Sequence, residues 1–299
     1  MDVNIQKYMA LISVVEQGSF SRAAEAMAYS QSGISRMVKD LENEWGFTLV
    51  ERGKRGVALT SDGMAILPYV KRIVEDFRML QRQTEEISGL ETGLIRIGTI
   101  ASVAANLLPD IISRFQKDHP RIEFELMLGG YDEIRSWISD GTADCGFLSL
   151  DAAGGLDCTE VLRDEFKVIL PEGHLLAKAA PASPSTSSDT FPLEKLADYP
   201  FILIEKKGST EISELLAEKG IKTNTRYTTI DDYAAMSMVE SGLGISILNG
   251  LVLERCPYRI VHMSMPDTAY RTIVFAVRNK EMCSRAVREF SEYVISNTE

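Results

Sequence analysis

The sequence has few of the features that mark membrane-spanning or exported proteins. No run of apolar residues reaches 18, so the chain contains no candidate for a membrane-spanning helix. Its N-terminus lacks a cationic start followed by an apolar stretch and a small-residue cleavage site, so we expect no secretory signal. These absences favour a cytoplasmic protein with no membrane partner.

Metal-ligating and redox-active residues are also scarce. The chain has four cysteines and three histidines, and no two cysteines form a C-x-x-C pair. A zinc site needs clustered ligands, and disulfide-based redox sensing needs a close cysteine pair. We therefore expect no metal site, no cofactor, and cysteines that serve packing. The scattered positions are Cys145, Cys158, Cys256, Cys283, His119, His174 and His262.

An excess of positive charge is missing as well. The formal net charge is −11, and the isoelectric point is near 5.0. The first 90 residues hold 11 Lys and Arg against 12 Asp and Glu, whereas the remainder holds 21 against 31. Any DNA binding must therefore rely on locally placed cations. We expect modest affinity per monomer, a strong dependence on salt, and a gain from oligomerisation.

What the chain does have is a pattern typical of a helix-turn-helix. Ile34, Val38, Leu41 and Trp45 recur at the spacing of one apolar helix stripe, and Ser30 stands where an N-cap begins that helix. The opposite face carries amides, hydroxyls and cations, which suit base edges and phosphates. A merely solvated polar face is the alternative. The predicted DNA-contacting residues in this region are Ser21, Arg22, Ser30, Gln31, Ser32, Ser35, Arg36 and Lys39.

The flanking segments strengthen the DNA-binding interpretation. Four alanines in the preceding helix, Ala23, Ala24, Ala26 and Ala28, predict a slim helix that crosses closely. After the helix pair, residues 49–52 and 57–60 read as two short strands joined by a glycine-containing turn. This indicates a winged helix-turn-helix whose wing carries cations toward the phosphate backbone. Those cations are Arg52, Lys54 and Arg55.

A long helix is predicted next, capped by Thr60 or Ser61 and running to about Gly89, with a bend at Pro68. Its apolar positions alternate by four and three residues, a narrow seam on a helix roughly 40 Å long. A second copy of the same helix is the simplest partner for such a seam, so we expect a homodimer. A helix packed on its own domain is the alternative. The seam residues are Ile66, Val70, Ile73, Phe77, Leu80 and Ile87.

The C-terminal two-thirds alternates between strand and helix patterns. Strands are expected at 94–98, 122–128, 144–148, 166–170, 201–204, 226–229 and 273–277. Helices are expected at 107–118, at 131–139, from a cap at Asp231 to Ser241, and from about Lys280 onward. The strand-helix-strand order of the first three strands predicts a parallel sheet covered by helices, and the Ala-, Pro-, Ser- and Thr-rich stretch 178–192 predicts a loop.

Ligands of such sheets bind beyond the carboxyl ends of the strands. Hydroxyls and glycines at these ends suit a small anion, although they are also ordinary turn residues. No arginine is evident in these segments to clamp a carboxylate, so an uncharged or weakly anionic effector remains open. The predicted effector-binding residues are Thr99, Ile100, Ala101, Ser102, Gly129, Gly130, Ser149, Ile204, Thr229 and Ile230.

Residues 1–63 resemble the DNA-binding domain of the LysR-type transcriptional regulators. The resemblance is carried by Phe20, Ala23-Ala24, Ser30-Gln31-Ser32, Ser35, Leu41-Glu42, Gly46, Leu49, Glu51-Arg52, Leu59-Thr60 and Gly63. Val50 and Gly33 depart from the usual pattern. Residues 91–299 resemble, more loosely, the effector-binding domain of the same family, which is akin to periplasmic binding proteins. The motifs there are Gly141-Thr142-Ala143-Asp144 and Gly242-Leu243-Gly244-Ile245.

The resemblance implies an α/β protein with an all-α-type winged helix-turn-helix at 1–63, a linker and dimerisation helix at 64–90, and a regulatory domain at 91–299. Subdomain I is expected at about 91–163 and 267–299, and subdomain II at about 164–266. The implied function is sequence-specific regulation of transcription, modulated by a small molecule bound between the subdomains. The implied partners are double-stranded DNA, further copies in a dimer or tetramer, the small-molecule effector and, as a candidate, RNA polymerase.

Three other classes of protein compete with this interpretation. An enzyme is disfavoured because Gly242-Leu243-Gly244 is only a fragment of a dinucleotide fingerprint, and no nucleophile elbow or phosphate loop accompanies it. A transport solute-binding protein conflicts with the missing signal and the attached helix-turn-helix. A DNA-binding regulator whose C-terminal domain serves only assembly remains open, and ligand-dependent melting would separate it from a sensor.

Overall fold

The computed structural model describes residues 4–53, 56–87, 93–178, 190–205, 211–266 and 269–297. Three helices form the N-terminal head: α1 (Ile5–Gln17), α2 (Phe20–Met27) and α3 (Gln31–Trp45). Each begins at a side-chain cap, supplied by Asn4, Ser19 and Ser30 in turn. The apolar faces of the three helices pack into one core of the head.

The predicted stripe of α3 lies in this core, because Ile34, Val38 and Leu41 are buried. The alanine prediction holds only in part. Ala23 and Ala24 are buried at the helix crossing, whereas Ala26 and Ala28 are exposed. The reason is helical geometry, since the last two alanines lie on the solvent side of α2 and at its end.

The predicted wing is present as an antiparallel pair, β1 (Val50–Gly53) and β2 (Gly56–Leu59). The buried carboxylate of Glu42 on α3 fixes the start of this hairpin. Its Oε1 accepts hydrogen bonds from the backbone N–H groups of Leu49, at 2.9 Å, and Val50, at 3.4 Å. The wing therefore holds a defined position beside α3.

The linker helix α4 (Ser61–Ile87) is preceded by Thr60, whose Oγ1 caps it by accepting a hydrogen bond from the Gly63 N–H at 2.9 Å. The structure corrects the predicted seam. Val70 is buried in the head together with Val74, and Ile66 packs against the same core. The first half of α4 thus packs on α1 of its own head, as the alternative of a helix packed on its own domain predicts. The 27-residue helix is long enough to contact the head with one half and the C-terminal domain with the other.

Other apolar side chains of α4 remain uncovered in the single chain. Tyr69, Ile73 and Leu80 are 68%, 43% and 63% exposed, and Phe77 is half-buried. The side chain of Ile87 lies outside the described residues. The exposed stripe therefore differs from the predicted seam. It shares Ile73 and Leu80 with the seam and adds Tyr69.

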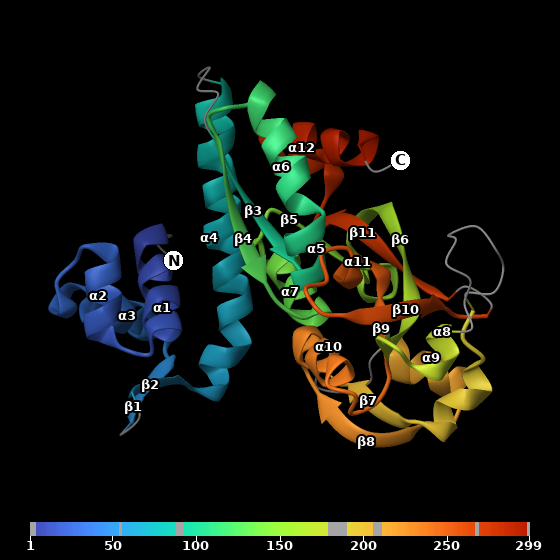
Figure 1. The fold of residues 1–299 in the computed structure, drawn as a ribbon. Coiled ribbons are helices and arrows are strands. Elements are labelled where there is room, and N and C mark those ends of the chain that lie inside the picture. The colour runs from blue at the N-terminus through green and yellow to red at the C-terminus, as the bar shows by residue number, and fades with distance from the viewer. Residues whose placement is uncertain are drawn as a thin grey trace.

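The second half of α4 lies against the regulatory domain of the same chain (Figure 1). Arg278 donates a hydrogen bond from Nη2 to Oδ1 of Asp76 at 2.8 Å. Glu75 is buried and packs so closely on Gly141 that a Cβ at that glycine would overlap its side chain. A small cavity lined by Glu75, Met79, Gly141 and Arg278, among others, lies beneath the helix. We call this contact the linker dock.

The first lobe of the regulatory domain starts with the predicted strand-helix alternation. It comprises β3 (Gly93–Thr99), α5 (Ala101–Asn106), α6 (Leu108–Asp118), β4 (Ile122–Leu128), α7 (Tyr131–Asp140), β5 (Cys145–Ser149) and the 3₁₀ turn η1 (Leu150–Ala152). β3 pairs in parallel with both β4 and β5. The helix predicted at 107–118 begins one residue later and is preceded by the separate α5.

The sheet as a whole is mixed rather than parallel. β6 (Asp157–Pro171) and β11 (Tyr270–Val277) run antiparallel to each other, and β11 is antiparallel to β5. The strand order is β10-β6-β11-β5-β3-β4, where β10 is Ile260–Ser264, and β9 (Ser246–Asn249) also pairs with β6. The parallel pairing predicted from the first three strands is confirmed for β3, β4 and β5. The remaining strands of this sheet pair antiparallel, because the chain crosses to a second lobe and returns instead of continuing a strand-helix-strand repeat.

The second lobe contains α8 (Leu175–Lys178), η2 (Leu193–Asp198), β7 (Pro200–Ile204), α9 (Glu211–Glu218), β8 (Asn224–Thr229), α10 (Asp232–Glu240), β9 (Ser246–Asn249), α11 (Gly250–Leu253) and β10 (Ile260–Ser264). The predicted cap of α10 is confirmed, since Asp231 accepts a hydrogen bond from the Ala234 N–H. The sequence patterns did not predict α8, α9, β9, α11 or β10.

The chain ends on the first lobe with η3 (Lys280–Met282) and α12 (Arg285–Ser296). The last helix was predicted to start near Lys280, but Ser284 is its N-cap, so it begins five residues later. Long β6 takes part in both lobes, pairing first with β11 and then with β9 and β10. Among the described residues, no helix combines the length and the apolar character needed to cross a bilayer.

Candidate functional sites

The outer face of α3 presents the predicted polar residues to solvent. Gln31, Ser32 and Arg36 are exposed, and Ser35 is half-buried. Ser30 uses its Oγ to cap the helix, accepting from the Gly33 N–H at 3.1 Å, and also lies 3.1 Å from Ser32 Oγ. We call Gln31, Ser32, Ser35 and Arg36 the reading face.

Not every predicted DNA-contacting residue is equally available. Lys39 is exposed, but its Nζ lies 3.4 Å from Oε2 of Glu42, the carboxylate that fixes the wing. Ser21 and Arg22 are exposed on α2. Arg52 belongs to β1, although its side chain lies outside the described residues, as do Lys54 and Arg55 entirely. The described part of the predicted interface therefore consists of α2 and α3.

Three of the predicted effector-binding positions are buried in the sheet. Thr99, Ser149 and Ile204 are 0%, 3% and 5% exposed. The Thr99 hydroxyl donates to the neighbouring Ile100 carbonyl at 3.3 Å, and Ile204 packs in the core of the second lobe. These three side chains are therefore covered by neighbouring elements rather than exposed at a turn.

The glycines and the β8 end have local structural roles. A Cβ at Gly129 would overlap the Trp137 ring, so packing accounts for that glycine. The Gly130 N–H donates to Glu133 Oε2 at 2.9 Å at the start of α7. Thr229 Oγ1 accepts from the Asp231 N–H at 3.2 Å, while Ile230 is 69% exposed. Ala101 is exposed and Ile100 partly buried.

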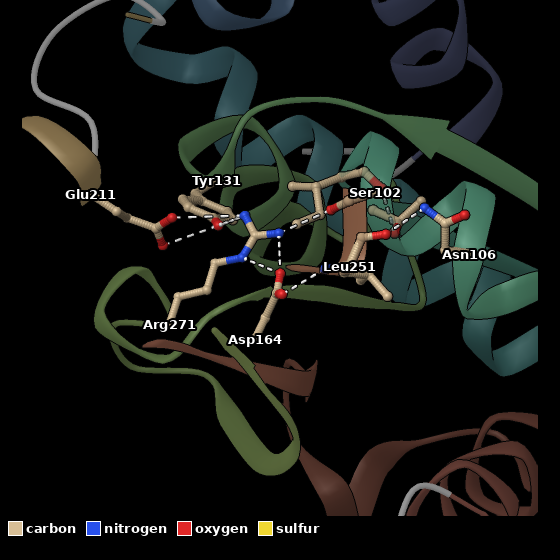
Figure 2. Close-up of polar contacts among 9 residues, drawn as sticks. Ser102, Asn106, Tyr131, Asp164, Glu211, Leu251 and Arg271 are labelled. Carbon is tan, nitrogen blue, oxygen red and sulfur yellow. Dashed lines mark hydrogen bonds and ion pairs between the residues drawn. The ribbon is translucent and has the colours of Figure 1, made fainter. Parts of the chain in front are cut away.

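Ser102 is the predicted effector residue that meets other functional side chains (Figure 2). It is 8% exposed, and its Oγ accepts a hydrogen bond from Nη2 of Arg271 at 3.0 Å. Arg271 stands near the start of β11, where the chain returns to the first lobe. The structure thus brings an arginine to Ser102 from outside the predicted strand-end segments, which themselves contain none.

Arg271 binds groups from both lobes. Its Nε and Nη2 donate to Oδ2 of Asp164 on β6 at 3.0 and 2.7 Å, and its Nη1 donates to the Tyr131 hydroxyl on α7 at 3.0 Å. Glu211, the first residue of α9, places Oε2 3.7 Å from Nη1 and accepts a hydrogen bond from the Tyr131 hydroxyl on Oε1 at 3.1 Å. We call Ser102, Tyr131, Asp164, Glu211 and Arg271 the cleft network.

The network is held in place at the junction of the lobes. Asp164 Oδ1 accepts from the Leu251 N–H at 2.8 Å, and the Leu251 carbonyl accepts from Asn106 Nδ2 at the same distance. The Asp164 side chain is 1% exposed, that of Arg271 9%, and that of Glu211 27%. Asp164 is therefore the buried partner of the arginine, and Glu211 is the solvent-accessible one.

Burial has consequences for protonation in the network. It raises the pKa of Tyr131 well above its usual value, an effect that Arg271 opposes and Glu211 reinforces. For Arg271, burial acts to lower the pKa, but Tyr131, Asp164 and Glu211 outweigh it and raise the pKa. At neutral pH the phenol thus keeps its proton and the guanidinium keeps its charge, so both act as hydrogen-bond donors.

No local pattern identified Arg271 as a functional residue. Its partner Ser102 lies 169 positions away along the chain, and Asp164 lies 107 positions away. The sequence offered one signal. Arg271 is a charged residue near the start of β11, and the rest of this strand, Ile273–Val277, is buried. A charge that enters a buried strand needs a partner, but the sequence does not say which one.

The thiols occupy protected positions. Cys145 is fully buried, and burial raises its pKa well above the ordinary thiol value, with Asp144 and Cys283 adding to the effect. Burial also raises the pKa of Cys283, whose Sγ donates to the Asn279 carbonyl. These two cysteines are close enough to interact, although they are far apart in sequence. Both keep their protons at neutral pH, which makes them poor nucleophiles.

The architecture defines a class: a helix-turn-helix head, joined through a long helix to a two-lobed α/β domain with a polar network between the lobes. Two family descriptions match the chain. "Bacterial regulatory helix-turn-helix protein, lysR family" matches residues 5–64, and "LysR substrate binding domain" matches residues 88–299. The chain belongs to the LysR family of DNA-binding transcriptional regulators, which carry a C-terminal substrate-binding domain.

Relatives and solved structures agree with this assignment. The chain is 29% identical over 277 residues to the probable HTH-type transcriptional regulator LrrA of Synechococcus elongatus, covering 92% of this chain and 90% of LrrA. It resembles a cysteine variant of full-length OxyR from Pseudomonas aeruginosa with a TM-score of 0.75 at 21% identity, covering 98% and 95% of the two chains. It also resembles full-length CbnR complexed with target DNA, with a TM-score of 0.70 at 21% identity over 99% and 100%. The two structural likenesses concern the fold.

Proposed function

We propose that this regulator reads a specific operator through α3, and that a small molecule bound between the two lobes modulates its occupancy of that operator. The observation that carries the proposal is the reading face. It presents Gln31, Ser32 and Arg36 to solvent on a helix whose other side is anchored in the head core. CbnR, a protein of the same fold, has been solved on its target DNA.

The chemistry of the reading face suits a major groove. A glutamine amide pairs with adenine, arginine pairs with guanine, and serine hydroxyls contact either bases or phosphates. The side chains of Gln31 and Arg36 are exposed to solvent, so both can turn toward DNA. Ser21, Arg22 and Ser30 at the edge of the helix pair, with Arg52, Lys54 and Arg55 of the wing, are proposed to contact the phosphate backbone.

We propose that two copies pair through the exposed stripe of α4. Tyr69, Ile73 and Leu80 lie on the part of this helix that its own head leaves uncovered. Pairing these stripes buries apolar surface and presents two reading faces to a two-fold-related site. Assembly of dimers into a tetramer, a contact with RNA polymerase, a cytoplasmic location and the lack of enzymatic activity complete the proposal.

The effector is proposed to bind in the cleft, at the positions predicted from the strand ends that border the cleft network. Ser102 carries this part, because its hydroxyl already belongs to a network that joins the lobes. A ligand that makes different contacts to open and closed lobes shifts their relative angle. The linker dock then passes the change to α4, and hence to the spacing of the heads on DNA.

Footprinting on the DNA upstream of its own coding region tests the proposal. We expect a dimer or larger assembly by sedimentation, protection of half-sites about 10 base pairs or a multiple apart, and affinity that falls steeply with salt. Footprint length is then compared with and without small carboxylates, amines and uncharged metabolites. A monomer that ignores this DNA at low ionic strength would refute the DNA-reading part. A footprint that no ligand changes, although a ligand binds, would refute the effector part.

A further inference from the structure

The cleft network contains a ready carboxylate site that one of the chain's own side chains fills. The two oxygens of Glu211 face two separate donors, the Tyr131 hydroxyl at 3.1 Å and Arg271 Nη1 at 3.7 Å (Figure 2). The donors come from α7 and β11, while the carboxylate comes from α9 in the second lobe. The Glu211 carboxylate therefore joins the two lobes through a hydrogen bond on one oxygen and a longer ion pair on the other.

The hydrogen-bond inventory of the guanidinium shows which partner is replaceable. Arg271 has five N–H groups. Two donate to Asp164, one to Ser102 and one to Tyr131, all within 3.0 Å. The fifth, on Nη1, has Glu211 at 3.7 Å as its partner among the described residues, which is too long for a good hydrogen bond. Arg271 thus keeps one under-used donor toward the cleft.

Asp164 and Glu211 differ in how firmly they are held. Asp164 is almost fully buried, and it also binds the Leu251 N–H, so removing it would leave a buried cation uncompensated. Glu211 is 27% exposed and stands at the first position of its helix. Its carboxylate can therefore regain water when it leaves, at a far smaller cost than the buried aspartate.

We propose that Glu211 is an internal stand-in for the effector, and that the effector is a small organic carboxylate which displaces Glu211 from Tyr131 and Arg271. This inference rests on the proposed function, since it assigns the chemistry of the ligand in that cleft. Exchange of one carboxylate for another leaves the charge of the site unchanged. Adding a carboxylate beside Glu211 would instead place three anions around one cation.

The exchange has a structural consequence. While Glu211 occupies the site, it ties the second lobe to Tyr131 of the first lobe. A free carboxylate satisfies the same donors without that covalent link to α9. The ligand therefore removes the contacts of Glu211 with Tyr131 and Arg271. The contacts that the rest of the ligand makes with the two lobes take their place. Competition with Glu211 also sets a minimum affinity for the ligand, because carboxylates that bind weakly fail to displace the Glu211 side chain.

Chemical rescue tests the assignment with simple carboxylates in place of the unidentified effector. In the full-length Glu211→Ala variant the site lacks its internal carboxylate, so acetate or formate can enter it. We expect saturable thermal stabilisation of this variant by acetate, at constant ionic strength against chloride, with an apparent affinity at least tenfold tighter than that of the wild type. Glu211→Gln, which keeps the side-chain volume, should respond less than Glu211→Ala because its amide still fills the site.

Glu214→Ala is the matched control, since Glu214 is exposed on the same helix. It should respond to acetate like the wild type, and adding Tyr131→Phe to Glu211→Ala should weaken the acetate response. Equal acetate responses of Glu211→Ala and Glu214→Ala would overturn the inference. Stabilisation of the wild type, but not of Glu211→Ala, by methylammonium would show instead that the site takes cations. Acetate rescue without any ligand effect on the footprint would leave this site standing and refute effector control.

Discussion

The reading face and the cleft network use charge in opposite ways. On the reading face, Arg36 and Gln31 extend into solvent from one helix. In the cleft, Arg271 is nearly buried and is bound by side chains from α5, β6, α7 and α9. Arg36 and Gln31 thus face solvent, whereas Arg271 is bound by other side chains of the same chain.

This difference explains a division of labour. A DNA-binding face gains affinity from cations that displace counterions, so leaving them free serves binding. A regulatory cleft must respond only to a suitable ligand, and internal partners that have to be displaced raise the threshold for binding. The same residue type, arginine, is thus exposed to solvent in the proposed DNA-reading region and buried among its partners in the other.

The largest expected effect concerns the head and tests whether the reading face binds DNA. Arg36→Ala should weaken operator binding by roughly tenfold or more for each half-site, since a base-reading pair contributes about 1–3 kcal/mol. Fluorescence anisotropy with operator and scrambled DNA measures it. Arg114→Ala, an exposed arginine on α6, is the control and should bind like the wild type. Equal losses in the two variants would contradict the assignment of the reading face.

The second prediction concerns how tightly the head is packed. A Cβ at Gly63 would overlap the Leu49 carbonyl oxygen and crowd Leu59, where α4 passes beneath the wing. Gly63→Ala should therefore destabilise the head by roughly 1–3 kcal/mol, as overpacking usually does. Urea unfolding followed by the fluorescence of Trp45 reports on this domain. Gly155→Ala, at a glycine with nothing within 4 Å, should change stability little. Indistinguishable midpoints would argue against the tight packing.

The local organisation of the head made it predictable from sequence. The α3 stripe, the Ser30 cap and the wing all follow from residues a few positions apart, and the structure confirms them. The linker seam was harder, because Val70 fits both a dimer heptad and the helical face that covers α1. Of the cleft network the sequence predicted Ser102 alone, because Arg271, Ser102 and Asp164 meet only once the lobes have folded. The position of effector contacts at strand ends stays a prediction.

The third and smallest expected effect is the pH dependence of the stability of the regulatory domain, which distinguishes this domain from the head. The groups whose pKa burial raises, Cys145, Cys283 and Tyr131, all belong to the regulatory domain. Above about pH 9 the unfolded chain loses protons that the folded domain retains, so unfolding becomes more favourable as the pH rises. Each such group contributes at most about 1.4 kcal/mol per pH unit.

Calorimetry between about pH 7.5 and 10.5 should therefore show the regulatory-domain transition moving to lower temperature in the alkaline range. On the acid side, burial lowers the pKa of His174 and His262, so their contribution is present above about pH 6.5 and is lost as the pH falls below it. Substituting Tyr131 with Phe and both thiols with Ser should flatten the alkaline slope. An unchanged slope would show that other groups control it.

The linker dock gives α4 the mechanics of a lever. Glu75 and Asp76 rest on the regulatory domain, while Ser61 lies 14 residues away, at roughly 21 Å along the helix. A rotation of about 10° at the dock moves the far end by roughly 3.6 Å, close to the rise of one base pair. A slight reorientation near Gly141 would thus produce a larger displacement where α4 meets the head.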